Sequence, residues 1–332
     1  MKAAVVGSGA WGTALAIRLC RNGHDVTLWC HDPARIPAME SSRRNPRLAA
    51  VDLPAELKIS GDYACVRGCK LVVIASPSSP IRAVSTAAAP HIDEDAVVAS
   101  VTKGLEAGSH LRMSQVVAEA IGREVVALTG PSHAEEVAID LPTGLLAACH
   151  NQAQAEFVQD AFMSDTLRVY TSPDPVGAEL GAALKNVIAL CAGITDGLGC
   201  GDNTKAMLMT RGLTETARLG VSLGARKETF AGLAGVGDLI VTCTSMHSRN
   251  RRAGILIGQG KAPQAAMQEV GAVVEGYYAT KSAYELGRFQ GIEMPITEAA
   301  YKVLYEGADV RETFSALLTR QKKCESEDAG WL

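Results

Sequence analysis

The stretch VVGSGAWGTALA, residues 5–16, lies where the first apolar run of the chain meets a glycine-rich loop. Lys2 to Val6 is short, apolar and bounded by glycine, which predicts a buried strand. Gly12 to Asn22 predicts a helix that stops at Gly23, and Asp25 to Trp29 predicts a second strand. A β-α-β unit within about thirty residues therefore opens the chain.

Three glycines divide this loop in the pattern Gly7-x-Gly9-x-x-Gly12. Gly7 permits a tight turn, Gly9 lets the backbone approach a pyrophosphate, and Gly12 allows the helix to pack closely on the strand. The N-terminus of the helix adds unpaired N–H groups and a positive dipole. Because the glycines stand between a predicted strand and a predicted helix, they indicate a loop that binds the pyrophosphate of NAD or NADP, rather than an ordinary tight turn.

The end of the second predicted strand is where such a unit distinguishes NAD from NADP. An acidic residue there binds the ribose hydroxyls of NAD, and an arginine favours the additional phosphate of NADP. This chain offers Cys30, His31 and Asp32. Asp32 either faces the ribose or caps a turn with Pro33. The sequence does not decide between these two roles, or between NAD and NADP.

Further strands follow at intervals along the first half of the chain. They are Leu71 to Ala75, Ala96 to Ser100, and Val125 to Leu128, which we expect to be the last. Helical stretches such as Ser109 to Ile121 lie between them. This alternation predicts a doubly wound, mostly parallel sheet of the Rossmann type.

The second half of the chain differs from the first in its predicted secondary structure. Thr171 to Pro175 reads as a linker, and few strand signals follow it. We therefore expect an α/β chain with a Rossmann-type domain over residues 1–172 and an all-α C-terminal domain over residues 173–332. The helices predicted there are Val176 to Leu198, Asn203 to Leu223, Arg251 to Gly258 and Tyr277 to Gln290.

The overall composition limits the classes of function. The chain has 332 residues, 47% hydrophobic and 20% charged, which is ordinary for two globular domains. Its net charge of −4 gives no electrostatic support for binding nucleic acid or a membrane surface. Its 9 cysteines lack the paired spacings of a metal site, so reduced thiols and no bound metal are expected. Without a signal peptide or an apolar run approaching the length of a membrane span, a cytoplasmic protein with no stable membrane insertion is expected.

Lys185 stands in the apolar stretch GAALKNVIAL, residues 181–190. Burial lowers the pKa of a lysine, which suits acid–base chemistry on a carbonyl or alcohol. The alternative is a lysine whose ammonium group extends to the surface. With a dinucleotide loop upstream we favour the functional interpretation, and Asn186 is placed to hydrogen-bond a substrate oxygen.

Polar residues also follow two of the predicted strands, at the edge where ligands bind in open α/β sheets. Lys103 follows the strand that ends at Ser100, and the alternative is an ordinary loop lysine. In TGPSHA, residues 129–134, Ser132 is predicted to cap the next helix beside Gly130, and plain turn chemistry is equally compatible with the composition. His133 is interpreted here as a packing or surface residue.

A basic stretch and an acidic residue complete the candidates. Ser248 is predicted to cap a helix, at whose start Arg249 and Asn250 could clamp a phosphate. The alternative is a solvated basic segment. Glu275 either accepts a hydrogen bond from a ribose or nicotinamide group or favours the N-terminus of the helix that follows it.

Taken together, the motifs of this chain resemble those of the bacterial NAD(P)-dependent glycerol-3-phosphate dehydrogenases. Their order and spacing cover nearly the whole chain, and the set is far more specific than any single motif. The resemblance implies interconversion of dihydroxyacetone phosphate and sn-glycerol 3-phosphate, which supplies phospholipid synthesis. The matching segments are GSGAWGTALA (7–16), VTKGLE (101–106), TGPSHAEEV (129–137), GAALKNVIAL (181–190), GLAGVGDLIVTC (232–243), SRN (248–250), VVEG (273–276) and MPI (294–296).

The resemblance also implies roles for individual residues, with the site between the two domains. Lys185 is the proton acceptor for the alcohol, and Thr242 belongs to the polar network around it. His31 stands where the family often has arginine, which puts a preference for NADP in doubt. The implied substrate contacts are Lys103, Gly130, Ser132, Asp238, Ser248, Arg249 and Asn250, and the implied cofactor contacts are Ala10, Trp11, Lys103, Ala134, Arg249, Val273 and Glu275.

Two other functions are compatible with the architecture. A β-hydroxyacid or 6-phosphogluconate-type dehydrogenase also combines a Rossmann domain with helices and a lysine, but the SRN and GVGDL segments argue against it. A non-catalytic dinucleotide-binding regulator needs neither a buried lysine nor a substrate clamp. A homodimer is one assembly that the sequence allows.

Overall fold

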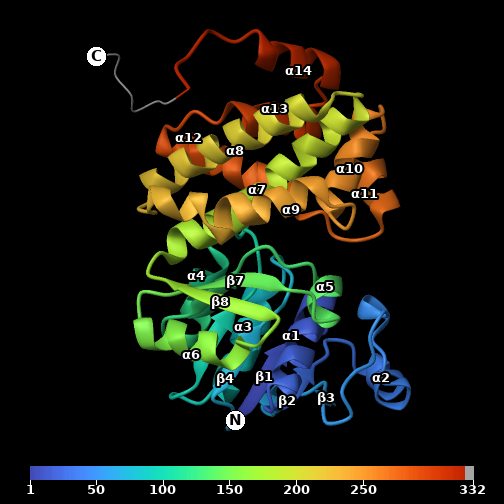
Figure 1. The fold of residues 1–332 in the computed structure, drawn as a ribbon, viewed down its shortest axis with the longest axis vertical. Helices are drawn as coiled ribbons and strands as arrows, with labels where there is room; N and C mark the ends of the chain where they lie inside the picture. Colours follow the sequence, from blue (N-terminus) through green and yellow to red (C-terminus); the bar gives the residue numbers. More distant parts are fainter. Residues whose placement is uncertain (326–332) are drawn as a thin grey trace.

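A single mixed sheet organises the N-terminal half of the protein (Figure 1). The structure is a computed structural model that describes residues 1–325. Within this part the sheet has eight strands in the order β3-β2-β1-β4-β5-β6-β7-β8, and every neighbouring pair is parallel except β6 and β7. The strands are β1 (Lys2–Val6), β2 (Asp25–Trp29), β3 (Lys58–Ser60), β4 (Leu71–Ile74), β5 (Val97–Ser100), β6 (Val126–Thr129), β7 (Thr143–Ala148) and β8 (Leu167–Ser172).

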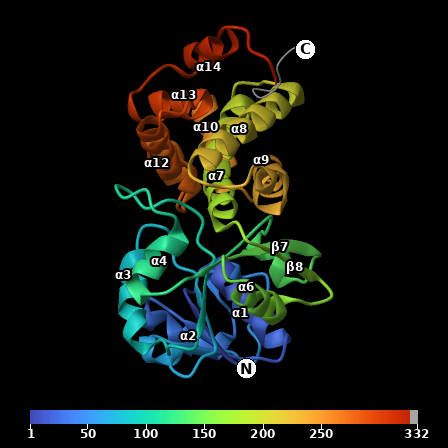
Figure 2. The same ribbon diagram turned by 90° about the vertical axis from the view of Figure 1, so that its left-hand side faces the viewer.

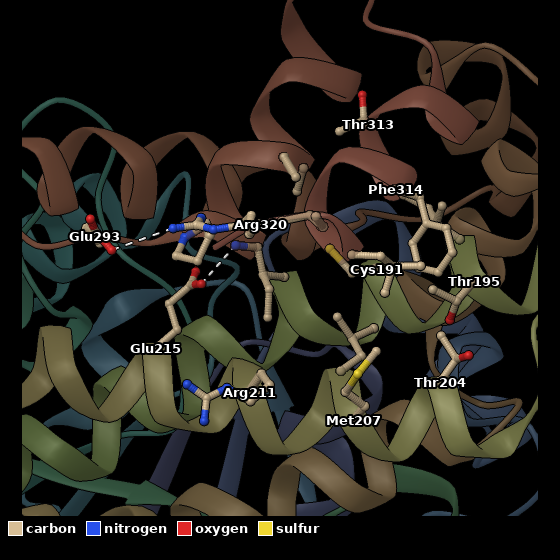
Figure 3. A pocket seen from close by; sticks show the side chains of 18 of the residues that line it. Cys191, Thr195, Thr204, Met207, Arg211, Glu215, Glu293, Thr313, Phe314 and Arg320 are labelled. Atoms are coloured by element: carbon tan, nitrogen blue, oxygen red, sulfur yellow. Dashed lines mark hydrogen bonds and ion pairs between the residues drawn. The ribbon is translucent and has the colours of Figure 1, made fainter. Parts of the chain in front are cut away.

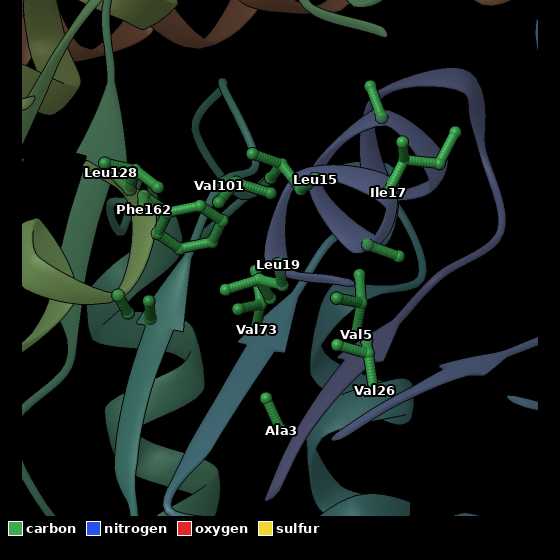
Figure 4. Packing of buried hydrophobic residues seen from close by; sticks show 14 of the residues in the cluster. Ala3, Val5, Leu15, Ile17, Leu19, Val26, Val73, Val101, Leu128 and Phe162 are labelled. Carbon is green, nitrogen blue, oxygen red and sulfur yellow. The ribbon is translucent and has the colours of Figure 1, made fainter. Parts of the chain in front are cut away.

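Helices cover both faces of this sheet, as the predicted doubly wound fold requires (Figure 2). Successive side chains of a strand point to opposite faces, so Val5 and Val73 pack with α1 and α6, whereas Val6 and Val72 pack with α3 and α4. Figure 4 shows the first of these cores, in which Phe162 fills the space beside Leu128. The helices are α1 (Ala10–Arg21), α2 (Ile36–Ser42), α3 (Ile81–Ala88), α4 (Met113–Ile121), α5 (Ala134–Ala138) and α6 (Gln152–Phe162).

Several predicted boundaries in this half are wrong. The first helix begins at Ala10 and not at Gly12, because Gly9 is its N-cap and accepts from the backbone of Thr13. The helix predicted from Ser109 begins at Met113, since a bridge between Leu105 and Arg112 holds the preceding residues in a loop. The expectation that the strand ending near Leu128 is the last one is also wrong, because β7 and β8 extend the sheet beyond it.

One long helix, α7 (Pro175–Gly197), forms the centre of the C-terminal half, where the described residues form no strand. Asp174 caps it by accepting from the backbone N–H of Gly177 at 2.9 Å. The predicted helices are present with shifted starts, α10 and α12 end at the predicted residues, and α9, α11, α13 and α14 were not anticipated. They are α8 (Asp202–Ser222), α9 (Asp238–Thr244), α10 (Arg249–Gly258), α11 (Pro263–Val270), α12 (Glu275–Gln290), α13 (Pro295–Tyr305) and α14 (Val310–Leu318).

By length and composition alone, helix α7 is long and apolar enough to cross a membrane. The expectation that no apolar run approaches that length is therefore wrong. Its apolar window is nevertheless completely buried inside the protein. Close packing explains its small residues: a Cβ on Gly193 would lie 2.1 Å from the carbonyl oxygen of Arg251 in α10. The composition of α7 therefore reflects its place in a protein core.

Candidate active site

The predicted dinucleotide loop connects β1 to α1 and makes unusually close backbone contacts. Gly7 has a φ of +136°, which favours glycine, and a Cβ on Gly12 would lie 2.0 Å from the carbonyl oxygen of Gly7. A Cβ on Gly9, in contrast, would meet nothing within 4 Å. Two glycines therefore build the turn, and the third leaves an open surface.

That open surface fits a dinucleotide. Gly9 caps α1 without a side-chain hydrogen bond, so the first-turn N–H groups are available to a phosphate. The indole Nε1 of Trp11 is buried and has no hydrogen-bond partner among the described residues. The indole N–H of Trp11 lacks an acceptor, and the backbone at Gly9 is open. A bound dinucleotide fits both features.

We expect opposite consequences from two substitutions in this loop. Gly12→Ala should lower the free energy of unfolding by about 1–3 kcal/mol, because its Cβ meets backbone that cannot move aside. Gly9→Ala should leave stability unchanged but weaken dinucleotide binding more than about tenfold, because its methyl group occupies the open surface. Thermal denaturation and NADH fluorescence titration measure the two effects. Equal stability of both variants would contradict the assignment of their roles.

At the end of β2, Asp32 makes the turn cap that was one of its two predicted roles. Its carboxylate accepts from the backbone N–H of Ala34 at 3.1 Å and caps the turn that begins at Pro33. Cys30 is buried and accepts from the hydroxyl of Ser8, and His31 is exposed. The turn cap is therefore present and uses one carboxylate oxygen of Asp32, Oδ1.

Lys185 lies at the centre of a buried polar cluster, which confirms its predicted burial. Its side chain is 7% exposed, and its Nζ donates to the carboxylate of Asp238 and, at 2.7 Å, to the hydroxyl of Thr242. Asp238 is completely buried and also accepts from Lys103 at 2.8 Å. Lys103 donates in addition to the carbonyl oxygen of Gly130 at 2.9 Å. One carboxylate thus holds two lysines, one from each half of the chain.

The backbone around Asp238 explains how this cluster is assembled. A short π-helix over residues 233–237 leads directly into α9, which begins at Asp238. Gly181 lets this turn approach α7, since a Cβ there would lie 2.5 Å from the carbonyl oxygen of Ala234. The close approach brings the carboxylate of Asp238 to Lys185, one turn further along α7.

The electrostatics of the cluster suit proton transfer near neutral pH. Burial lowers the pKa of Lys185 to about 7, and Lys103 acts in the same direction, whereas Asp238 opposes it. A lysine with such a pKa exchanges a proton readily at neutral pH. The geometry and the pKa therefore favour the functional interpretation over a surface-directed lysine.

A second hydrogen-bonded chain lies next to this cluster. The amide of Asn250 donates to Asn186 at 2.8 Å and accepts from the backbone N–H of Gly276 at 2.8 Å. Ser248 caps α10 as predicted, by accepting from the backbone N–H of Arg251 at 3.3 Å. Arg249 occupies the first turn of α10 with its side chain exposed. The α10 N-terminus thus places a cation and the N–H groups of a first helical turn beside the chain of amides.

The prediction that Ser132 caps the following helix is wrong. The N-cap of α5 is His133, and the hydroxyl of Ser132 donates instead to the carbonyl oxygen of Gly130 at 2.9 Å. Ala134 follows as the buried first residue of α5. The loop before α5 is one residue longer than the sequence suggested, so the Ser132 side chain points toward Gly130. Lys103 contacts the same residue.

Comparison with known proteins agrees with this arrangement. Family models for the N-terminus and the C-terminus of NAD-dependent glycerol-3-phosphate dehydrogenase match residues 2–155 and 174–315. The chain belongs to the NAD-dependent glycerol-3-phosphate dehydrogenase family. It is 52% identical over 98% of its length to the glycerol-3-phosphate dehydrogenase [NAD(P)+] of Thermoanaerobacter sp. (strain X514), of which 99% is covered.

Two further comparisons agree with this family. The enzyme of the same name from Desulfitobacterium hafniense (strain Y51) is 50% identical, with 98% of this chain and 94% of that protein covered. The crystal structure of glycerol-3-phosphate dehydrogenase from Coxiella burnetii superposes with a TM-score of 0.92 at 38% identity, covering 96% of this chain and 99% of that one. The resemblance inferred from the motifs is therefore confirmed, together with the fold class.

In this glycerol-3-phosphate dehydrogenase family member, Glu275 has a partner that the sequence did not indicate. Glu275 begins α12 and accepts from the hydroxyl of Ser78, which follows β4, at 2.8 Å. Burial raises the pKa of Glu275, while Ser78 and Arg249 oppose that shift. Val273, two residues earlier, is exposed. Because 197 positions separate Ser78 from Glu275, no local signal could have revealed the contact.

A separate cavity of about 520 Å³ lies in the helical half, between α7, α8, α13 and α14 (Figure 3). Figure 3 shows Phe314 and Met207 beside it, and Arg320 extended toward Glu293. Among the described residues, its lining includes none of the predicted site residues. Within residues 1–325, no group of three His, Cys, Asp or Glu side chains is arranged to hold a metal ion. The catalytic candidates are therefore the residues around Lys185.

Proposed function

We propose that this chain catalyses the reversible, NAD(P)-dependent reduction of dihydroxyacetone phosphate to sn-glycerol 3-phosphate. The observation that carries the proposal is the buried cluster in which Asp238 holds Lys185 and Lys103. Lys103 follows β5 at the carboxyl edge of the sheet, the edge that also carries the dinucleotide loop. The name shared by full-length relatives supports the same reaction.

The bound dinucleotide supplies the hydride, and the protein orients the substrate and moves the proton. Reduction of the ketone places negative charge on the oxygen at C2 of the substrate. Protonated Lys185 stabilises that charge and delivers its proton, and in the reverse direction neutral Lys185 accepts the proton of the alcohol. Asp238 and Thr242 hold the ammonium group in position, and Asn186 adds an amide at the same site.

The phosphate of the substrate requires a cationic socket, which we assign to the start of α10. Ser248, Arg249 and Asn250 offer a guanidinium, an amide and backbone N–H groups there. Gly130, Ser132 and Lys103 contribute to the substrate site from the opposite domain. A phosphate held in a fixed position also fixes C2 of the substrate relative to the hydride donor. This orientation of the reacting atoms increases the rate.

We assign the cofactor to the loop after β1 and to further residues from both domains. Lys103 and Arg249 are shared between the cofactor and the substrate. Asp32 and His31 lie at the adenosine end, where they bear on the choice between NAD and NADP. The proposed cofactor contacts are Gly7, Gly9, Ala10, Trp11, Gly12, His31, Asp32, Lys103, Ala134, Arg249, Val273 and Glu275.

The reaction is tested by following NADH and NADPH oxidation side by side with dihydroxyacetone phosphate. We expect rapid oxidation of the dinucleotide with this substrate and little with β-keto acids, and little reduction of NAD+ or NADP+ with β-hydroxyacids or 6-phosphogluconate. A preference for those compounds would favour the related dehydrogenases. Dinucleotide binding without oxidation in the presence of any of these substrates would favour a regulator.

We expect Arg249→Ala to raise the KM for dihydroxyacetone phosphate about 10- to 100-fold, with kcat changed less than about threefold, because a charged hydrogen bond to the phosphate is lost. Arg252→Ala is the matched control, since Arg252 is an exposed arginine on the same helix. Steady-state kinetics with each substrate varied in turn measures both variants. An effect on dinucleotide affinity alone would exclude the phosphate role.

We further propose the wider organisation of the enzyme. The end of β8 at Ser172 and the start of α7 at Pro175 support domains over residues 1–172 and 173–332. A cytoplasmic location without membrane insertion, and a role in supplying phospholipid synthesis, accord with the buried α7 and the reaction. We propose a homodimer as the assembly, which analytical ultracentrifugation tests directly.

A further inference from the structure

His133 is a partly buried polar residue that the mechanism above does not use. It lies between Ser132 and Ala134 as the N-cap of α5, in an extended conformation, and its side chain makes no capping hydrogen bond. The imidazole Nε2 is buried and has no hydrogen-bond partner among residues 1–325. Buried polar atoms are nearly always paired, so an unpaired ring nitrogen next to a substrate site calls for a partner that arrives with the substrate.

The surroundings of the ring come from both halves of the protein. Its centroid lies 5.5 Å from that of His247, at an interplanar angle of 51°. His247 immediately precedes Ser248, at the start of the proposed phosphate socket. Thus His133, from the sheet domain, lies beside the residue that precedes the N-cap of α10.

Burial favours a neutral imidazole ring on His133. Burial lowers its pKa, and Lys185 and His247 act in the same direction, whereas Glu135 and Glu136 on α5 oppose them. A neutral imidazole carries one N–H, and the oxygens of a dianionic phosphate only accept hydrogen bonds. A phosphate at this place therefore selects the tautomer with hydrogen on Nε2, the atom that is unpaired.

We propose that His133 binds the phosphate of the substrate through Nε2–H and is a further specificity-determining residue for phosphorylated substrates. The proposal rests on the proposed function. With His133 on the sheet domain and Arg249 on the helical domain, the phosphate contacts both domains at once. A substrate without a phosphate lacks this contact and leaves Nε2 unpaired, which disfavours its binding.

Three variants of the full chain test this role. His133→Phe keeps a ring of similar size without a donor, and His133→Gln keeps an N–H donor near the position of Nε2. His150→Phe is the control, because His150 is exposed and precedes α6. For His133→Phe we expect the KM for dihydroxyacetone phosphate to rise about 10- to 100-fold, with kcat changed less than about threefold.

Two comparisons separate phosphate binding from a structural effect. The kcat/KM for unphosphorylated dihydroxyacetone should change less than about twofold in His133→Phe. In His133→Gln the KM for dihydroxyacetone phosphate should return to within about threefold of the unsubstituted enzyme. Titration calorimetry with sn-glycerol 3-phosphate should show the same order of affinities, and it provides a readout that does not depend on turnover.

Several results would overturn the proposal. Equal losses in His133→Phe and His133→Gln, or equal losses with dihydroxyacetone and its phosphate, would indicate a packing role. A raised KM for the dinucleotide alone would place His133 at the cofactor. If the unsubstituted enzyme fails to reduce dihydroxyacetone phosphate, the proposed function fails. An unchanged KM in His133→Phe, with an active unsubstituted enzyme, contradicts only the role of His133.

Discussion

Replacing Lys185 with alanine should lower kcat about 10³- to 10⁴-fold while leaving the affinity for NADH within about twofold of normal. The variant loses both the proton donor and the positive charge that stabilises the developing oxyanion. Its effect on the dinucleotide is small because Lys185 contacts Asp238 and Thr242 and lies outside the glycine loop. Stopped-flow reduction of dihydroxyacetone phosphate and NADH fluorescence titration measure the two quantities.

Lys205→Ala provides the matched control for this variant. Lys205 is also a partly buried, ion-paired lysine of the helical domain, 15% exposed and 2.8 Å from Asp196. We expect its removal to change thermal stability and to leave kcat within about twofold. Turnover near normal in Lys185→Ala would rule out Lys185 as the proton donor.

The pH dependence of the reaction should report the same group. Because the pKa of Lys185 is lowered to about 7, the protonated form is lost as the pH rises through that value. The rate of ketone reduction should therefore fall above about pH 7, whereas the rate of alcohol oxidation should rise across the same range. Opposite pH dependences of ketone reduction and alcohol oxidation indicate one group that transfers the proton in both reactions. Unfolding would lower both rates.

Asp238→Asn should produce the second large effect, with kcat reduced about 10²- to 10³-fold. The amide keeps the volume of the side chain but removes the charge that both Lys103 and Lys185 contact. Loss of one partner from a buried ion pair also destabilises a protein by about 3–5 kcal/mol. Since Asp238 opposes the lowering of the Lys185 pKa, its neutralisation should move the pH profile for reduction to lower pH.

Asp196→Asn separates the catalytic part of this effect from the structural part. Asp196 likewise pairs two cations in the helical domain, Lys205 and Arg251, each at 2.8 Å. We expect a loss of stability in this variant without a displaced pH profile. A profile for Asp238→Asn that coincides with that of the unsubstituted enzyme would show that Asp238 does not tune Lys185.

Short-range signals account for the features that were predicted correctly. The strands Lys2–Val6 and Asp25–Trp29 have the predicted bounds, because a compact apolar run between glycines admits few other conformations. The end of α7 was predicted within a residue, and the apolar neighbours of Lys185 foretold its burial. Strands β7 and β8 were missed, although the alternation of Leu167, Arg168, Val169 and Tyr170 is a strand signal.

The sequence by itself determined the dinucleotide loop, the doubly wound domain, the helical domain and the burial of Lys185, because glycine spacing and apolar periodicity act over a few neighbouring residues. The tertiary structure alone decided that Lys185 and Lys103 share Asp238 and that Glu275 pairs with Ser78. It also oriented Ser132 and left the Nε2 of His133 without a hydrogen-bond partner among residues 1–325. These contacts join residues distant along the chain, so they depend on how closely α7, α9 and the edge of the sheet approach one another, which no local pattern encodes.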